Sequence, residues 1–123
     1  MKKKIVISIN PEFVEKIRNG EKRYEYRTRV AKQDIDAILI YETYPVKRVV
    51  AEAEIIDIVY LPKEELWALT KDKSGINKCF FDQYFMGKEF AYAYKLGNVK
   101  FYDSPKELSE IGIRTAPQSF MYV

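Results

Sequence analysis

The sequence predicts an α+β domain built on a small twisted β-barrel of about six strands, with short helices inserted between the strands. Three observations support this fold class. The chain has 123 residues, enough for one compact domain with a hydrophobic core. It contains several short segments with strand periodicity. Signals for helix starts and stops stand between those segments.

The first predicted elements are a strand, a helix and a second strand. Residues 5–9 are rich in β-branched side chains and predict a short strand. Asn10 is a favourable N-cap, and Pro11 occupies the first helical position, where its missing N–H costs nothing. Gly20 ends this helix. Residues 20–29 alternate aromatic and charged side chains and predict the second strand.

Two further strands follow. Residues 36–41 are almost continuously apolar and predict a buried central strand. Residues 48–60 predict a long strand with small alanines on one face and glutamates on the other. The alternation slips at Ile55 and Ile56, which indicates a bulge or a bend.

The second half of the chain predicts short helices and a hairpin. Pro62 begins one helix, and residues 80–85 form another that ends near Gly87. Residues 90–94 and 99–102 predict the two strands of a hairpin that turns across residues 96–98.

A last helix is predicted close to the C-terminal end. Ser104, Pro105 and Glu107 have the spacing of a capping box, so we expect a short helix from this point to Glu110. Gly112 ends it.

The charge is distributed unevenly. Residues 1–30 contain nine Lys or Arg and four Glu, a net charge of +5, whereas the remaining residues contain twelve Lys or Arg and fourteen Asp or Glu. A basic segment fits an anionic partner, of which nucleic acid is the commonest. The alternative is that Lys2–Lys4 only solubilise the terminus.

The composition excludes several classes of chemistry. The chain has no histidine, which removes histidine triads and the common zinc sites, so we expect no metal and no cofactor. Cys79 is the single cysteine and cannot form an intrachain disulfide. No apolar run is long enough for a membrane helix or a signal peptide. We therefore expect a cytoplasmic protein without a membrane partner.

The tightest grouping of candidate catalytic side chains is Lys22, Glu25 and Arg27. Without histidine, catalysis depends on Lys, Glu, Asp, Tyr, Ser or Thr side chains. Glu25 and Arg27 are two residues apart on a predicted strand, so they point to the same side. Taken alone, this spacing is better explained by an ordinary ion pair on a solvated face than by a site.

Three segments together resemble the ASCH domain family, and in particular its small stand-alone prokaryotic members. They are "SINPEFVEKIRNGEKRYEYRTR" (residues 8–29), "ILIYETYPVKRVVAEAEI" (residues 38–55) and "APQSFMYV" (residues 116–123). Shorter matches at "LW" (residues 66–67), "GINKCFFDQYFMGKEFAYA" (residues 75–93) and "SPKELSEIGI" (residues 104–113) also resemble that subgroup. The resemblance therefore covers nearly the whole chain and implies one PUA-like domain over residues 1–123. A PUA-like domain is a small β-barrel with a cleft beside it, similar to domains that bind RNA.

The family's Gly-x-Lys-x-x-x-x-Arg segment lines that cleft, and it matches Gly20, Lys22 and Arg27 in this chain. The glutamate that accompanies it matches Glu25. The resemblance thus implies that the tyrosines of residues 20–29 fill the barrel and that the charged residues line the cleft, so the surface ion pair becomes the weaker interpretation.

These observations predict a domain that binds RNA or a modified nucleotide. They do not specify any protein partner. The predicted ligand-binding residues are Lys22, Glu25, Arg27, Arg29, Thr43, Lys47, Gln118 and Ser119.

The alternative is an enzyme, either a ribonuclease or an amidohydrolase that acts on an acylated nucleoside such as N4-acetylcytidine. Lys22 and Glu25 would then be catalytic. Some bacterial ASCH proteins resemble such an amidohydrolase, which uses the matching lysine, a threonine and a glutamate. The threonine aligns with Glu25 and is therefore missing here.

The resemblance also implies that the C-terminal tail borders the same cleft. Pro117 makes a central strand unfavourable there, because it lacks an N–H donor. We expect a group from residues 118–120 to lie within hydrogen-bond reach of Glu25 or Arg27, directly or through one water.

Overall fold

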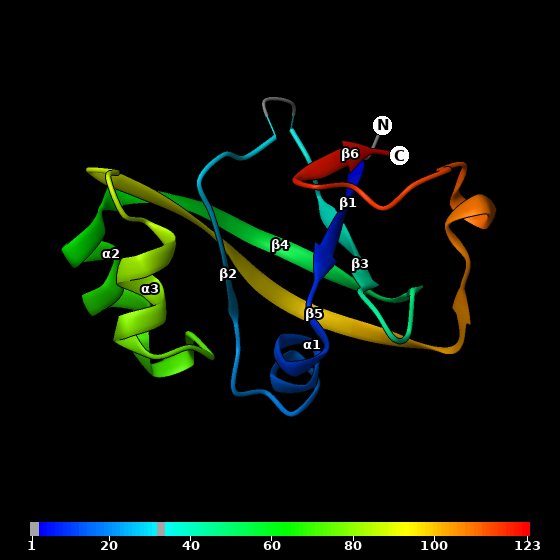
Figure 1. Ribbon diagram of the computed structural model, residues 1–123, viewed down its shortest axis with the longest axis horizontal. Coiled ribbons are helices and arrows are strands. Elements are labelled where there is room, and N and C mark those ends of the chain that lie inside the picture. The colour runs from blue at the N-terminus through cyan, green and yellow to red at the C-terminus, as the bar shows by residue number, and fades with distance from the viewer. Residues whose placement is uncertain (1–2, 32–33) are drawn as a thin grey trace.

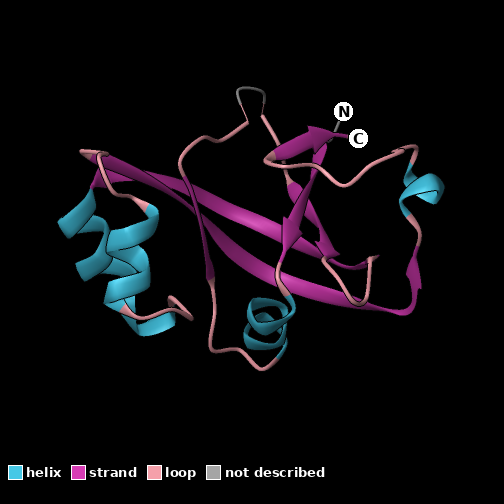
Figure 2. Cartoon of the chain, viewed as in Figure 1, coloured by secondary structure: helices cyan, strands magenta, loops and turns pink. Residues whose placement is uncertain are grey.

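The described part of the chain, residues 3–31 and 34–123 of a computed structural model, folds into one mixed sheet of six strands that curves into a half-barrel (Figure 1). The order of the strands is β2-β5-β4-β3-β1-β6. Short helices lie beside this sheet (Figure 2). The strands are β1 (Lys4–Ile9), β2 (Tyr24–Arg27), β3 (Ala37–Glu42), β4 (Arg48–Pro62), β5 (Phe90–Lys106) and β6 (Phe120–Tyr122). The α-helices are α1 (Pro11–Arg18), α2 (Lys63–Thr70) and α3 (Lys78–Tyr84), and the 3-10 helices are η1 (Lys71–Lys73) and η2 (Leu108–Ile111).

The first half of the chain follows the prediction closely. β1 and β3 pair in parallel, from Lys4 opposite Ala37 to Ile9 opposite Glu42, and both strands are largely buried. Asn10 precedes α1 and Pro11 begins it, as the sequence indicates. Four of the six residues of β1 are buried because helices or strands cover both faces at the centre of the fold.

β4 and β5 form a long antiparallel ribbon that dominates the sheet. β4 has 15 residues and β5 has 17. Their register shifts on both sides of Ile55, which confirms the bulge or bend predicted at Ile55 and Ile56. The extra residues increase the local twist and bend the ribbon around the barrel core.

The predicted hairpin over residues 90–102 is wrong, because β5 is a single strand through this region. Leu96 and Gly97 are buried and do not form an exposed turn. A Cβ atom on Gly97 would collide with the Glu54 carboxylate and would come within 2.9 Å of Ile56 Cγ1. Gly97 therefore marks a close approach of β4 to β5 at the shifted register.

The predicted helix from Ser104 to Glu110 is also wrong at its start. β5 continues to Lys106, which pairs with Val49, and η2 begins only after Glu107. The capping box joins Glu107 and Glu110: each side chain accepts a hydrogen bond from the other residue's backbone N–H. A glutamate thus takes the capping position predicted for the serine. Gly112, with a φ of 81°, ends the helix as expected.

Two of the three clusters of buried side chains, the barrel core and the layer under α2 and α3, lie on opposite faces of the sheet. The barrel core contains the β1 and β3 isoleucines, Val14 and Ile17 of α1, and Tyr94 of β5. A second layer lies between the ribbon and helices α2 and α3. Tyr26 is only 5% exposed, so it is buried as expected, but it packs in this second layer and not inside the barrel.

The segment that leads into β2 is fastened to the turn after η1. Lys22 forms a β-bridge with Ser74, and the Arg23 N–H donates to the Lys73 carbonyl over 2.8 Å. The Lys22 side chain then passes directly over Gly75, whose φ is +70°. A Cβ atom there would lie 2.6–2.9 Å from the Cβ, Cγ and Cδ atoms of Lys22. Glycine is therefore required at position 75, because any larger residue would collide with the Lys22 side chain.

Gly75→Ala should therefore cost more stability than Gly87→Ala. Both residues have positive φ, 70° and 81°, so alanine is strained at each by about 1–3 kcal/mol. Nothing lies within 4 Å of a Cβ atom at Gly87, whereas the Lys22 stem blocks Gly75. We expect an additional loss of about 1–3 kcal/mol in the free energy of unfolding for Gly75→Ala, measured by urea denaturation. Equal losses for the two variants would show that the Lys22 stem does not pass this turn.

Candidate functional site

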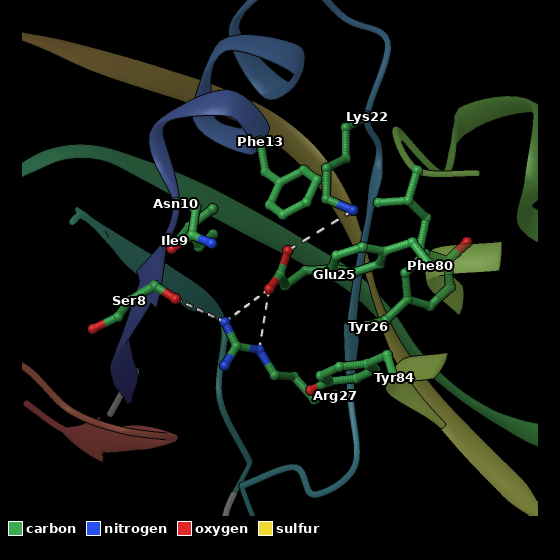
Figure 3. A pocket seen from close by; sticks show the side chains of 11 residues that line it. Ser8, Ile9, Asn10, Phe13, Lys22, Glu25, Tyr26, Arg27, Phe80 and Tyr84 are labelled. Carbon is green, nitrogen blue, oxygen red and sulfur yellow. Dashed lines mark hydrogen bonds and ion pairs between the residues drawn. The ribbon is translucent and has the colours of Figure 1, made fainter. Parts of the chain in front are cut away.

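A pocket opens where the end of β1, the start of α1, β2 and α3 meet (Figure 3). Its volume is about 160 Å³, below the range of about 300–1,000 Å³ that is usual for drug-sized ligands. This size suits a single small group. We call it the Lys22 pocket, and its lining residues are Ser8, Ile9, Asn10, Phe13, Lys22, Glu25, Tyr26, Arg27, Ile76, Phe80 and Tyr84.

Glu25 and Arg27 form a tight ion pair on one face of β2. Arg27 donates from Nε and Nη2 to Glu25 Oε2 over 3.1 and 2.8 Å. Nη2 also donates to the Ser8 carbonyl over 3.0 Å, which joins β2 to β1. The side chains of Glu25 and Arg27 are only 10% and 14% exposed. Their charges are therefore poorly screened by solvent, unlike those of a surface pair.

Lys22 completes a row of three charges, which we call the charge row. Its Nζ donates to the Ser74 carbonyl over 2.7 Å and lies 4.0 Å from Glu25 Oε1. The carboxylate of Glu25 therefore stands between an ammonium and a guanidinium (Figure 3). Lys22 is only 3% exposed, which is rare for a lysine.

Burial dominates the electrostatics of Lys22. Desolvation lowers the pKa of the Lys22 amine, and the positive charges of Arg27 and Lys16 lower it further, while Glu25 acts in the opposite direction. Lys16 lies close because its own Nζ donates to the Gly75 carbonyl. The Lys22 pKa is thus below its ordinary value of 10.5, so the neutral amine is more accessible than in an exposed lysine.

Tyr26 is a structural neighbour of the charge row. Its ring lies 5.0 Å from Lys22 Nζ, and its hydroxyl shares a buried hydrogen bond with Thr70 Oγ1. Burial raises the pKa of Tyr26 to about 12, although the hydrogen bond to Thr70 opposes the shift. The phenol therefore stays protonated near neutral pH and contributes a ring face to the pocket.

Aromatic rings form the opposite wall. Phe13 of α1 and Phe80 of α3 meet edge to face with their centroids 5.4 Å apart. Phe80 and Tyr84 are 43% and 39% exposed, so part of each ring is accessible to a ligand. A flat ligand would find aromatic surface on one side and hydrogen-bonding groups on the other.

The charge row has hydrogen-bonding atoms that could contact a ligand. Glu25 Oε1 is 4.0 Å from Lys22 Nζ, beyond hydrogen-bond distance, and Arg27 Nη1 makes no hydrogen bond within residues 3–31 and 34–123. The pocket therefore presents one carboxylate acceptor beside guanidinium and ammonium donors. Such a combination matches a ligand edge that carries both a donor and an acceptor.

The remaining predicted site residues lie elsewhere. Thr43 donates from its hydroxyl to Asn10 Oδ1 over 3.2 Å, so it supports the pocket wall from behind. Arg29 lines a separate hollow with Tyr92 and Tyr122. Lys47, with a φ of 51°, lines another hollow beside η2. The structure thus brings together Lys22, Glu25 and Arg27 but not these three. Lys2 of the basic N-terminal run lies outside the described residues.

The C-terminal tail approaches the Lys22 pocket indirectly. β6 pairs with β1 at the edge of the sheet, so residues 120–122 do not form a central strand, as expected. Ser8 Oγ donates to the Pro117 carbonyl over 2.8 Å, and the Ser8 carbonyl accepts from Arg27. Among the described residues, the tail is thus joined to Arg27 through Ser8. Gln118 and Ser119 do not line the pocket.

The sequence does not indicate the walls of the pocket. Aromatic residues such as Phe13 and Phe80 are typical of apolar helix faces, and Ser8 contributes a backbone carbonyl that has no side-chain signature. Ser74 is 2% exposed and its carbonyl accepts from the Lys22 ammonium, which is again a backbone contact. The sequence signal at Asn10 is that of a helix N-cap and not that of a pocket residue.

No helix in residues 3–31 and 34–123 is long and apolar enough to cross a membrane. The same residues contain no group of three or more His, Cys, Asp or Glu side chains placed to share a metal ion.

Comparison with known proteins identifies relatives of this chain. The chain is 35% identical over 96 residues to an ASCH domain-containing ribonuclease from Zymomonas mobilis subsp. mobilis, a match that covers 77% of this chain and 65% of that protein. It is 28% identical over 120 residues to the large ribosomal subunit protein uL22 of Ureaplasma parvum serovar 3. That match covers 97% of this chain but only 39% of the relative's length.

Solved structures agree with the fold. The crystal structure of ASCH from Zymomonas mobilis superposes with a TM-score of 0.88 at 31% identity, covering 98% of this chain and 87% of that chain. This similarity confirms the predicted PUA-like α+β architecture. The ASCH domain model matches residues 7–110, most of the chain. The chain therefore belongs to the ASCH domain family.

Proposed function

We propose that this domain binds RNA and holds one base, normal or modified, in the Lys22 pocket. The observation that carries the proposal is the buried charge row beside aromatic walls. Glu25 Oε1 would accept from an amino or imino group of the base, and Arg27 or Lys22 would donate to a carbonyl. Phe80 and Tyr84 would contact the base with their exposed rings.

The charge distribution and the relatives support an RNA ligand. The first 30 residues carry the net charge of +5 that attracts a phosphate backbone. The Zymomonas mobilis relative is named a ribonuclease, which makes RNA its substrate, and it shares 35% of the aligned residues. RNA-binding domains commonly read unstacked bases by combining aromatic contacts with hydrogen bonds to the base edges.

Burial of Lys22 favours hydrolysis as a second candidate. A lysine whose pKa is lowered by burial supplies a neutral amine that can act as a base or a nucleophile. Glu25, 4.0 Å away, would move a proton, and Arg27 would stabilise an oxyanion. The substrate would be an acylated nucleoside, which is the substrate of the amidohydrolase that some bacterial ASCH proteins resemble, or it would be the RNA backbone.

The first test is RNA binding by variants of equal charge. Lys22→Met keeps most of the stem but removes the ammonium, so we expect binding of a labelled single-stranded RNA to weaken about tenfold or more. Lys100→Met removes the same charge from an exposed position that lines another hollow, and we expect a change of about twofold or less. Fluorescence anisotropy at about 50 and 200 mM salt provides the measurement, and affinity should fall with salt.

Urea denaturation establishes that both variants fold. If the wild type does not bind RNA even at the lower salt concentration, the proposed function is wrong. Equal weakening by the two substitutions would mean that RNA binds through net charge and not through the Lys22 pocket.

The second test separates binding from hydrolysis. The wild type and Lys22→Met are incubated with N4-acetylcytidine and, separately, with the single-stranded RNA, and the products are separated by chromatography. Binding alone leaves both compounds intact, which is the result that we expect. Release of cytidine or of RNA fragments by the wild type but not by Lys22→Met would replace the binding proposal with hydrolysis. Identical purification of the two proteins controls for contaminating nucleases.

A further inference from the structure

Three aromatic side chains form a stacked row at the end of the β4–β5 ribbon. The ring of Tyr60 lies 4.2 Å from that of Tyr92 and 5.1 Å from that of Phe90, measured between centroids, with interplanar angles of 28° and 23°. We call Tyr60, Phe90 and Tyr92 the aromatic strip. Stacked geometry distinguishes it from the edge-to-face contacts of Tyr26, Phe81 and Phe85 in the core.

Core packing does not explain the aromatic strip. Tyr60 and Phe90 are 52% and 39% exposed. Helices α2 and α3 cover the other face of the ribbon, where Leu61, Ala91 and Ala93 pack. The ribbon extends past β2 toward these helices (Figure 1), so its end carries exposed rings on the uncovered face.

The aromatic strip and the Glu25–Arg27 pair occupy the same face of the sheet. Residues directly opposite each other on paired strands project to one side. Arg27 is opposite Tyr92, and Tyr92 is opposite Tyr60. Neighbouring strands are about 4.8 Å apart, so the aromatic strip begins about 5–10 Å from Arg27 across the sheet. Arg27 thus stands between the Lys22 pocket and the rings.

A hollow with a basic residue adjoins the aromatic strip. Tyr92 lines it together with Arg29 and Tyr122, and Arg29 is the charged residue among its described lining residues. A polyanion in this hollow would therefore meet the positive charge of Arg29, with no carboxylate among the described lining residues. Charge of one sign beside flat, exposed rings is the combination that single-stranded nucleic-acid sites use.

We propose that the aromatic strip is a second base-binding surface, which stacks the nucleotide next to the one in the Lys22 pocket. This inference rests on the proposed function and extends it from a single base to a single-stranded segment. The phosphate between the two nucleotides would pass Arg27 or Arg29. Tyr60, the central ring of the row and its most exposed member, contributes most of the stacking surface.

The experiment compares a mononucleotide with an oligonucleotide. Labelled adenosine monophosphate and a labelled oligoadenylate of about ten nucleotides are titrated against the wild type, Tyr60→Ala, Tyr60→Phe and Tyr44→Ala. We expect Tyr60→Ala to weaken binding of the oligonucleotide about tenfold and to leave binding of the mononucleotide within about twofold. Tyr60→Phe keeps the ring and should bind like the wild type. Tyr44 is 77% exposed on a different turn, so Tyr44→Ala should also match the wild type.

Three other results would contradict one or both proposals. If the wild type binds the oligonucleotide and Tyr60→Ala binds it equally well, the aromatic strip is not a base-binding surface, while the proposed function stands. If the wild type binds neither probe, both proposals fail. If sedimentation shows a wild-type dimer that Tyr60→Ala dissociates, the strip contacts a second copy of the chain and not RNA.

Discussion

The structure around the pocket depends on the burial of one charged side chain, Lys22. Moving an ammonium out of water costs several kcal/mol unless the protein supplies acceptors and an opposite charge. The Ser74 carbonyl and the Glu25 carboxylate supply them at 2.7 and 4.0 Å. Glu25 in turn needs Arg27, and Arg27 reaches the Ser8 carbonyl of β1. One buried charge thus connects the turn after η1 to β2 and the barrel.

The same connections explain why the site lies where it does. β5 pairs with β2 along one edge, and the bridge between Lys22 and Ser74 fixes the residues that lead into β2. The side chains on the barrel side of β2 therefore have a fixed orientation. That face carries Glu25 and Arg27, and the paired residues of β5 and β4 continue it as rings. The Glu25–Arg27 pair and the aromatic strip therefore lie on one sheet surface. The desolvation of buried charges offsets their mutual attraction, so the net contribution of this ion pair to stability is small.

Local patterns were sufficient to predict some elements and insufficient for others. β1, α1 and β3 follow from β-branched runs and from the Asn10–Pro11 start signal, because each pattern depends on a few neighbouring residues. In the sequence, Gly97 is typical of a turn. Its role in the structure is to leave room for Glu54 and Ile56 of the partner strand, and that role is not visible in the local sequence. Sequence spacing singles out Lys22, Glu25 and Arg27, and the family resemblance favours a cleft over a surface ion pair. The burial of Lys22 is not predictable, because its Nζ donates to Ser74, 52 residues away in the sequence. The aromatic strip likewise requires the register of β4 against β5.

Direct titration of the Lys22 amine by NMR tests the central claim, that this ammonium is buried at an energetic cost. Lysine side chains labelled with isotopes are followed from neutral to alkaline pH in the wild type and in Lys22→Met, whose missing signal assigns Lys22. The account predicts one lysine that loses its proton clearly below 10.5, with the signal absent from the variant. A Lys22 amine that titrates at or above 10.5 would contradict it, because the side chain would then be solvated or fully compensated by Glu25.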